Sequence, residues 1–105
     1  MNTESDALAE KITEALRVVI DPELGYNIID LGLVYEVKVT DGGVVDILMT
    51  TTTRGCPAAS FLKDGARDGA WTVPGVEFVN VTLTYEPHWI PEMMTAEAKE
   101  HLGFA

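Results

Sequence analysis

The chain has 105 residues, of which 47% are hydrophobic, and this length supports one domain with a single modest core. Its 17 acidic residues outnumber its 7 Lys and Arg residues, which gives a formal net charge of -10. Phosphate backbones and anionic lipid headgroups would repel such a chain, so neither nucleic acid nor a membrane surface is expected as a partner.

The N-terminal stretch MNTESDALAEK lacks the basic and apolar regions of a secretory signal, and no apolar run approaches the roughly 20 residues that span a bilayer. A cytoplasmic location is therefore expected. In a reducing compartment Cys56, the one cysteine of the chain, stays a free thiol because it has no intramolecular partner.

The first third of the chain predicts a helix followed by an ordered loop. Apolar residues recur at helical spacing from Leu8 to Val19, and Ser5 is available as an N-cap, so residues 6–19 are predicted to form an amphipathic helix. The stretch DPELGYNIIDLG contains an Asp-Pro pair and two glycines, which favour irregular chain over residues 21–32.

The next segment predicts a β-hairpin. From Leu33 to Thr40 apolar and polar residues alternate, which is the pattern of a half-buried strand, with Tyr35 expected on the same face as Val37 and Val39. Asp41-Gly42-Gly43 is a strong hairpin signal leading into a second strand, VVDILMT, over residues 44–50.

A second helix is predicted to begin at Pro57, because the first helical position does not need the N–H that proline lacks. It continues through AASFLKDGARDGAW despite Gly65 and Gly69. Glycines weaken a helix, and these two allow close packing either against the sheet or against a partner.

After a turn at residues 73–75, the stretch VEFVNVTLTYE predicts a third strand, with Val79, Val81, Leu83 and Tyr85 on one face. Thr95 is expected to cap a short final helix that stops at Gly103. The order α-β-β-α-β-α predicts an α+β domain of two layers, a small mixed sheet with helices on one face.

Cys56 is placed between a glycine and a proline, in the stretch TTTTRGCPAAS. If the strand ends near Thr50 and the helix begins at Pro57, the cysteine is the helix N-cap, where the positive end of the helix dipole lowers a thiol pKa and favours a nucleophile or metal ligand. Arg54 could add to this effect. Equally, Gly55 provides a tight turn and Cys56 merely replaces serine as a cap, and position alone leaves both interpretations open.

Three segments carry a resemblance to a known family: DPELGYNIIDLGLVYEV, MTTTTRGCP, and VPGVEFVNVTLTYEPHWIPEMMTAEAKEHLG. Together they resemble the signature blocks of small iron–sulfur cluster assembly domains related to PaaD and SufT, over roughly residues 8–104. The resemblance implies the fold of the C-terminal domain of NifU-type scaffolds. It also implies a role in assembling or delivering iron–sulfur clusters, with a reactive cysteine at Cys56.

The resemblance further implies that the Asp-Pro-Glu block and the Asp-Leu-Gly block lie near the cysteine. Asp21 or Asp30 would then orient the Cys56 loop by accepting hydrogen bonds from its N–H groups or from threonine hydroxyls. The residues expected to support the site are Asp21, Glu23, Asp30, Thr52, Thr53, Arg54 and Gly55. From spacing alone, Asp21-Pro22-Glu23 is simple turn chemistry.

The third block departs from the family pattern at His88, where a second proline is often found. This histidine is either an extra metal ligand or a surface imidazole, and one histidine near one cysteine favours the surface interpretation. His101 falls in the last turn of a short helix, where a cation suits the dipole, and is assigned no chemistry.

Iron–sulfur clusters usually need four protein ligands, and this chain offers one thiolate. The expected cofactor is therefore a labile cluster, bridging two chains of a homodimer or completed by small thiols, by His88 or by a client. Assembly proteins and client apo-proteins are the expected partners. Alternatively, the domain is an adaptor that binds assembly machinery or an oxygenase client and never holds a cluster. The charge of -10 suits docking to basic proteins in both cases.

A thiol enzyme is the rival from another functional class. Such an enzyme needs a resolving thiol or a base positioned on Cys56. The chain has no second cysteine, and His88 belongs to a different predicted loop. A non-enzymatic role is therefore expected.

Overall fold

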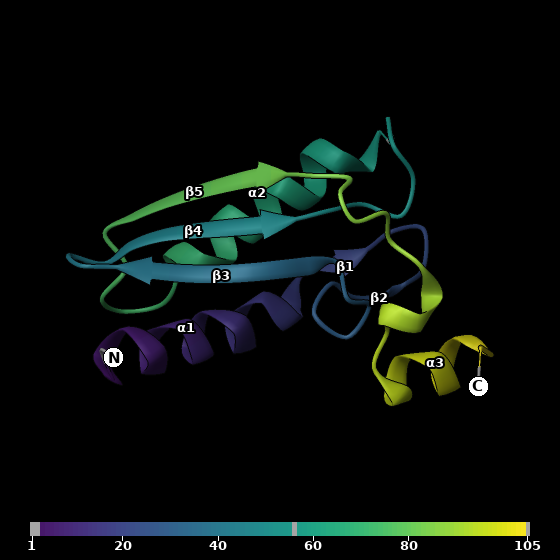
Figure 1. Cartoon of the computed structure of the whole chain (residues 1–105), viewed down its shortest axis with the longest axis horizontal. Helices are drawn as coiled ribbons and strands as arrows, with labels where there is room; N and C mark the ends of the chain where they lie inside the picture. Colours follow the sequence, from purple (N-terminus) through teal and green to yellow (C-terminus); the bar gives the residue numbers. More distant parts are fainter. Residues whose placement is uncertain (1–2, 56, 105) are drawn as a thin grey trace.

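A three-stranded mixed sheet forms one layer of the structure, and two helices packed against it form the other (Figure 1). This is a computed structural model, and it describes residues 3–55 and 57–104. The strands are β3 (Val34–Thr40), β4 (Val44–Met49) and β5 (Phe78–Leu83), in the spatial order β3-β4-β5. The predicted α+β class is confirmed.

The sheet is mixed because its two strand pairs are connected differently. The turn at residues 41–43 returns the chain directly, so β3 and β4 are antiparallel. The helix α2 (Ala58–Trp71) connects β4 to β5, and these two strands are parallel, as a crossover through a helix allows. The predicted hairpin and the predicted mixed sheet are both present.

Two helices cover one face of the sheet. The helix α1 (Thr3–Ala15) continues as a 3-10 turn, η1 (Leu16–Val18), and packs against β3, while α2 packs against β5. Their apolar stripes meet the inward-facing residues of the strands in one core. The largest fully buried side chains there are Ile12, Leu16, Ile28, Leu31, Leu33, Ile47, Met49 and Leu62.

The glycines of α2 allow close packing of this helix against η1. A Cβ built on Gly65 would lie 3.1 Å from Val19 Cγ1, and one on Gly69 would lie 3.5 Å from Leu16 Cδ2. The contact at Gly65 is tighter than an ordinary Cβ contact, whereas the one at Gly69 is an ordinary van der Waals contact. The helical cost of Gly65 thus accompanies a close contact of α2 with the end of η1.

The loop predicted over residues 21–32 is more regular than its composition suggested. Two short strands, β1 (Ile20–Asp21) and β2 (Tyr26–Asn27), pair in antiparallel fashion within it. The pairing is short because Asp21 accepts hydrogen bonds in a turn immediately afterwards. The expectation of wholly irregular chain is thus corrected.

The third helix does not share the sheet face with the other two. In Figure 1, α3 (Ala96–Leu102) lies beyond the end of the sheet, next to the β1–β2 region. The Thr95 N–H donates to the Asp30 carbonyl at 2.8 Å, and the Thr95 hydroxyl accepts from the Ala98 N–H at 3.2 Å, so Thr95 is the predicted cap. The expectation of helices on one face therefore holds for α1 and α2 and is wrong for α3.

A β-bulge changes the predicted faces of β3. The register with β4 shifts between Val34 and Glu36, so Val34 joins Val37 and Val39 against the core. Tyr35 leaves that face, and its hydroxyl donates to the Pro87 carbonyl at 2.8 Å. Strict alternation had placed Tyr35 with the core residues, and the extra residue of the bulge is the reason for the difference.

Two predicted boundaries also shift. The helix α2 begins at Ala58, and Pro57 is its N-cap rather than its first residue. The strand β5 ends at Leu83, where β4 also ends, so Tyr85 lies outside the sheet.

Among the described residues, no helix is long and apolar enough to cross a membrane.

Replacing Gly32 by Ala should destabilise the domain by about 2–4 kcal/mol, because Gly32 has a φ of +76° and an added Cβ would collide with the Met93 backbone. Gly25 is the matched control: its φ is +70°, and a Cβ there would have nothing within 4 Å. Gly25→Ala should cost only about 1 kcal/mol, the conformational term alone. Urea unfolding measures both variants, and equal losses would show that the Met93 contact does not matter.

Candidate functional site

Residues 50–55 follow β4, and we call them the threonine loop. The Thr50 N–H donates to the Leu33 carbonyl at 2.8 Å, and the side chains of Thr50 and Thr51 are buried. From Thr53 to Gly55 the loop is exposed, and Gly55 adopts a φ of +75°, a conformation that favours glycine. The loop is thus fixed at its sheet end and open to solvent where it approaches α2.

Tyr85 braces this loop from the segment that follows β5. The hydroxyls of Tyr85 and Thr51 lie 2.9 Å apart, and the Thr51 hydroxyl donates to the Thr53 carbonyl at 2.8 Å. Because a threonine hydroxyl has one hydrogen, Tyr85 is the donor to Thr51. The Arg54 guanidinium carbon lies 4.9 Å from the centre of the Tyr85 ring, a cation–π contact.

Tyr85 is the residue that sequence reasoning missed as part of the site. The alternation VEFVNVTLTYE placed it on the apolar face of a strand, and the strand ends two residues earlier. Its position in the third family block, next to His88 and Trp89, was the available signal.

The Asp-Pro-Glu block forms a turn and reaches the threonine loop through Glu23. The buried Asp21 carboxylate accepts hydrogen bonds from the backbone N–H groups of Glu23 at 2.7 Å and Leu24 at 3.2 Å. These bonds are the turn chemistry expected of Asp-Pro. The Thr52 hydroxyl donates to Glu23 Oε2 at 3.5 Å, a long bond that joins segments 29 residues apart.

Asp30 is held by a different set of partners. Its carboxylate accepts from Arg17 Nη1 at 2.7 Å and from Asn27 Nδ2 at 2.9 Å, and its side chain is 9% exposed. Burial raises the pKa of Asp30, but the hydrogen bonds from Asn27 and Arg17 outweigh this effect and hold the pKa below its ordinary value. These contacts tie the Asp-Leu-Gly block to η1, and a role of Asp30 at the Cys56 loop stays a prediction.

Cys56 and His88 are the remaining predicted ligands. Cys56 falls outside the described residues, so its thiol pKa stays a prediction. Its predicted place as the N-cap of α2 is wrong, because Pro57 is the N-cap. His88 is exposed between β5 and the 3-10 turn η2 (Pro91–Met93). Within residues 3–55 and 57–104, no group of three or more His, Asp and Glu side chains is placed to hold a metal ion.

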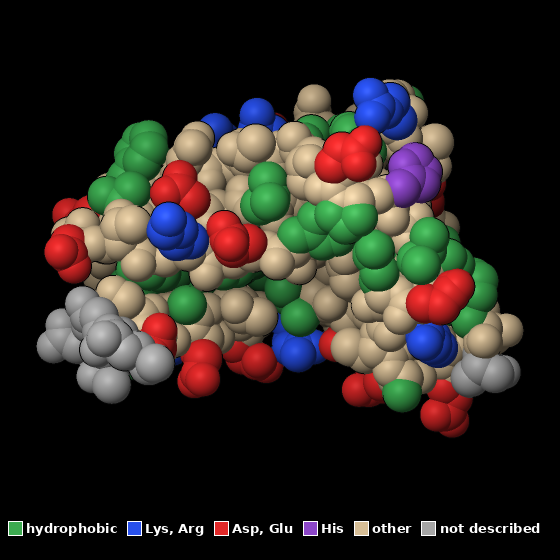
Figure 2. Space-filling view, viewed as in Figure 1, with side chains coloured by type: hydrophobic (Ala, Val, Ile, Leu, Met, Phe, Trp, Pro, Cys, Tyr) green, Lys and Arg blue, Asp and Glu red, His purple; other side chains and the backbone are tan. Residues whose placement is uncertain are grey.

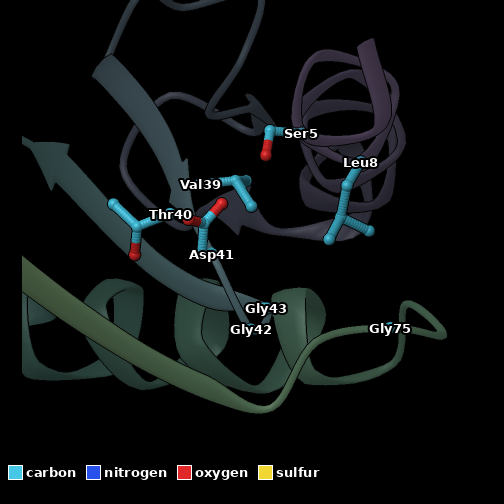
Figure 3. Close-up of a pocket in the computed structure, with 8 residues that line it drawn as sticks. All are labelled: Ser5, Leu8, Val39, Thr40, Asp41, Gly42, Gly43 and Gly75. Carbon is cyan, nitrogen blue, oxygen red and sulfur yellow. The ribbon is translucent and has the colours of Figure 1, made fainter. Parts of the chain in front are cut away.

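The distribution of charge and the hollow beside the β3–β4 turn give no second candidate for a metal or cluster site among these residues. Asp and Glu side chains lie along the edge formed by α1 and α3 (Figure 2). A hollow of about 340 Å³ between the start of α1 and the β3–β4 turn is lined by Ser5, Leu8 and glycines, with Asp41 as its one ionisable side chain (Figure 3). Its chemistry offers no ligand set.

The Asp30 contacts predict a pH dependence of folding. Because the folded-state pKa of Asp30 is lowered, its contribution to stability is present above about pH 4 and is lost as the pH falls through the folded-state pKa. Asp30→Asn should reduce the free energy of unfolding by about 1–3 kcal/mol at pH 7. Between pH 7 and pH 3 the free energy of unfolding of this variant should fall less steeply than that of the unmodified protein. Urea unfolding between pH 7 and pH 3 tests this, with the exposed Asp41→Asn as a control that should follow the unmodified protein.

The Tyr85 brace predicts a local effect on the threonine loop. Tyr85→Phe removes the hydroxyl that is hydrogen-bonded to Thr51 but keeps the aromatic ring next to Arg54. It should lower the free energy of unfolding by about 1 kcal/mol. Amide hydrogen exchange of residues 52–55 should accelerate in Tyr85→Phe and more so in Tyr85→Leu, while exchange in β4 stays unchanged. Tyr26→Phe is the control, because it also loses a tyrosine hydroxyl but lies on β2, where its ring contacts His101. Unchanged exchange in the loop of both Tyr85 variants would contradict the brace.

Comparison with known proteins identifies the family. The family model described as "Iron-sulfur cluster assembly protein" matches residues 9–83. An "Fe-S protein maturation auxiliary factor" of Porphyromonas gingivalis is 44% identical and covers 99% of both chains, and the factor SufT of Staphylococcus aureus is 41% identical over 82% of this chain and 98% of its own. A crystal structure of a domain of unknown function from Bacillus anthracis superposes with a TM-score of 0.92 at 36% identity, covering 98% of each chain. The chain therefore belongs to the iron–sulfur cluster assembly protein family.

Proposed function

We propose that this domain assembles or delivers iron–sulfur clusters and that Cys56 supplies its cluster ligand. The observation that carries the proposal is the threonine loop, which leads from the end of β4 to the chain's one cysteine and is braced by Tyr85. Relatives named as Fe–S protein maturation auxiliary factors, and another named as an iron–sulfur cluster carrier protein, support the same role.

The cluster is cargo in this proposal and not a resident cofactor. One thiolate leaves most of the usual four coordination sites to be filled, and the described residues add no ligand group. The missing ligands come from outside the chain: from a second copy across a two-fold axis, from small thiols, or from the client. Such under-ligation makes the cluster labile, which suits transfer.

The threonine loop supports the site in this proposal through Thr52, Thr53, Arg54 and Gly55. Arg54 rests on the Tyr85 ring two residues before the cysteine in sequence, where its positive charge favours a thiolate. Gly55 permits the turn, and Thr52 connects the loop to Glu23 of the Asp-Pro-Glu block. Asp21 fixes that block by accepting hydrogen bonds from the backbone N–H groups of Glu23 and Leu24.

No enzymatic turnover is part of the proposal, because catalysis at Cys56 needs a positioned base or a second thiol. His88 is assigned no ligand role, since it is exposed in a separate loop. The partners are iron–sulfur assembly proteins and client apo-proteins. The proposed location is the cytoplasm, where a reducing environment keeps a lone thiol free.

The second candidate is an adaptor that binds assembly machinery or a client without holding a cluster. The net charge of -10 is compatible with this role, because it suits docking to basic protein surfaces, and it is equally compatible with the first proposal. It differs from the first proposal in requiring no metal at Cys56.

Anaerobic reconstitution with iron and sulfide distinguishes the two functions. The proposal expects visible cluster absorbance in the unmodified protein and its loss in Cys56→Ser, while His88→Ala keeps it. The Cys56→Ser domain should fold normally, as measured by circular dichroism, because serine is a small polar replacement. Absence of absorbance in the unmodified protein would favour the adaptor.

Mass measurement in solution, before and after reconstitution, identifies the source of the missing ligands. A cluster bridging two chains predicts a dimer that forms only with iron and sulfide and that Cys56→Ser abolishes. A monomer that carries cluster absorbance would eliminate the bridged dimer and assign the remaining ligands to small thiols or a partner.

A further inference from the structure

An apolar groove lies between the η1–β1 segment and one flank of α2. It encloses about 420 Å³ and is lined by Val18, Val19, Ile20, Phe61, Gly65 and Asp68, among others. Three of these apolar side chains are strongly exposed: Val18 by 77%, Phe61 by 59% and Ile20 by 45%. One exposed apolar side chain is ordinary, whereas several around one hollow mark an interaction site.

The groove exists because glycine occupies its floor. Gly65 follows Phe61 by one helical turn, and its missing side chain allows α2 to contact Val19 directly. Phe61 and Val18 therefore stand above a floor of backbone and buried Val19. The feature that packs α2 against η1 also leaves the hollow open.

The groove begins next to the proposed cluster site. Phe61 lies in the first turn of α2, which follows the threonine loop, and Ile20 directly precedes Asp21 of the Asp-Pro-Glu block. A protein bound in the groove would therefore lie close to the exposed end of the threonine loop. That loop directly precedes Cys56 in the sequence.

The charge around the groove indicates what kind of partner fits. Asp68 is the one charged side chain among the described lining residues. Arg67 on α2 lies 3.7 Å from Asp64 and 3.8 Å from Asp68, and Arg17 of η1 is paired with Glu14 and Asp30. Lys63 is a further cation on α2, so the attraction for a basic partner comes from Asp68 at the groove and from the net charge of -10 of the whole chain.

A second copy of this chain fits the groove poorly on electrostatic grounds. Two chains of charge -10 repel each other. A basic segment gains attraction at the same place, which raises its association rate and selects it over acidic competitors.

We propose that this groove docks an apolar segment of a client apo-protein, flanked by Lys or Arg residues, and so presents the client to Cys56. The inference rests on the proposed function for its choice of client, and it adds the surface and the chemistry of the partner. Phe61 and Val18 are its anchors, and Asp68 contacts the basic flank.

An amide NMR titration of the metal-free domain tests the groove with two synthetic amphipathic peptides, one of Leu and Lys and one of Leu and Glu. The Leu–Lys peptide should shift the signals of residues 18–20 and 61–72, and the Leu–Glu peptide at equal concentration should not. Phe61→Ser should weaken Leu–Lys binding at least about tenfold. Phe78→Ser is the matched control, because Phe78 is 55% exposed on β5 and should leave binding unchanged.

Shifts spread over the whole acidic surface, or equal affinity of Phe61→Ser and the unmodified protein, would overturn the docking site. A concentration-dependent dimer of the metal-free chain that Phe61→Ser abolishes would assign the groove to a second copy instead, and would also overturn it. The titration involves no cluster, so a failed reconstitution with intact peptide binding would defeat the proposed function alone. Phe61→Ser that still acquires cluster absorbance but binds no peptide would separate docking from ligation.

Discussion

The parallel pairing of β4 with β5 is the constraint on which the site depends. Because the two strands run in the same direction, both end at one edge of the sheet, Met49 opposite Leu83. The threonine loop leaves from the first strand and Tyr85 follows the second, so their hydroxyls meet. The antiparallel strand β3 begins opposite Met49, which brings the preceding Asp-Pro-Glu and Asp-Leu-Gly blocks to the same edge, at the right of Figure 1. Residues from all three family segments therefore lie at the same edge of the sheet.

The polar groups at this edge mainly satisfy one another. Asp21 is occupied by its own turn, Asp30 by Arg17 and Asn27, and Thr51 by Tyr85 and Thr53. Buried polar groups must be paired, and this network fixes the loops without forming a metal-binding cluster of carboxylates or imidazoles among the described residues. In the proposed function a loop fixed in this way suits temporary ligation, because it keeps its conformation while a partner completes the coordination.

The groove beside α2 follows from the same packing that holds the helix layer together. Gly65 and Gly69 let α2 approach Val19 and Leu16, and the space above them stays open to solvent between Phe61 and Val18. The cost of glycine in a helix is roughly 1 kcal/mol per residue relative to alanine. Close packing against η1 offsets part of that cost, and the proposed docking of a client would cover the exposed side chains of Phe61 and Val18.

The sequence by itself determined the three α-helices and the three strands of the main sheet, because apolar spacing of three and four or of two residues directly encodes helices and strands. Asp-Gly-Gly and Thr95 likewise encode a turn and a cap. It also contained the three family segments, and it pointed to all of the residues proposed for the site except Tyr85. Only the tertiary structure decided the bulge at Tyr35, the place of α3, the pairing of Asp30 with Arg17 and the brace from Tyr85 to Thr51, 34 residues away. These features depend on which strands pair and where each pairing ends, and periodicity within one segment carries no information about contacts between distant segments.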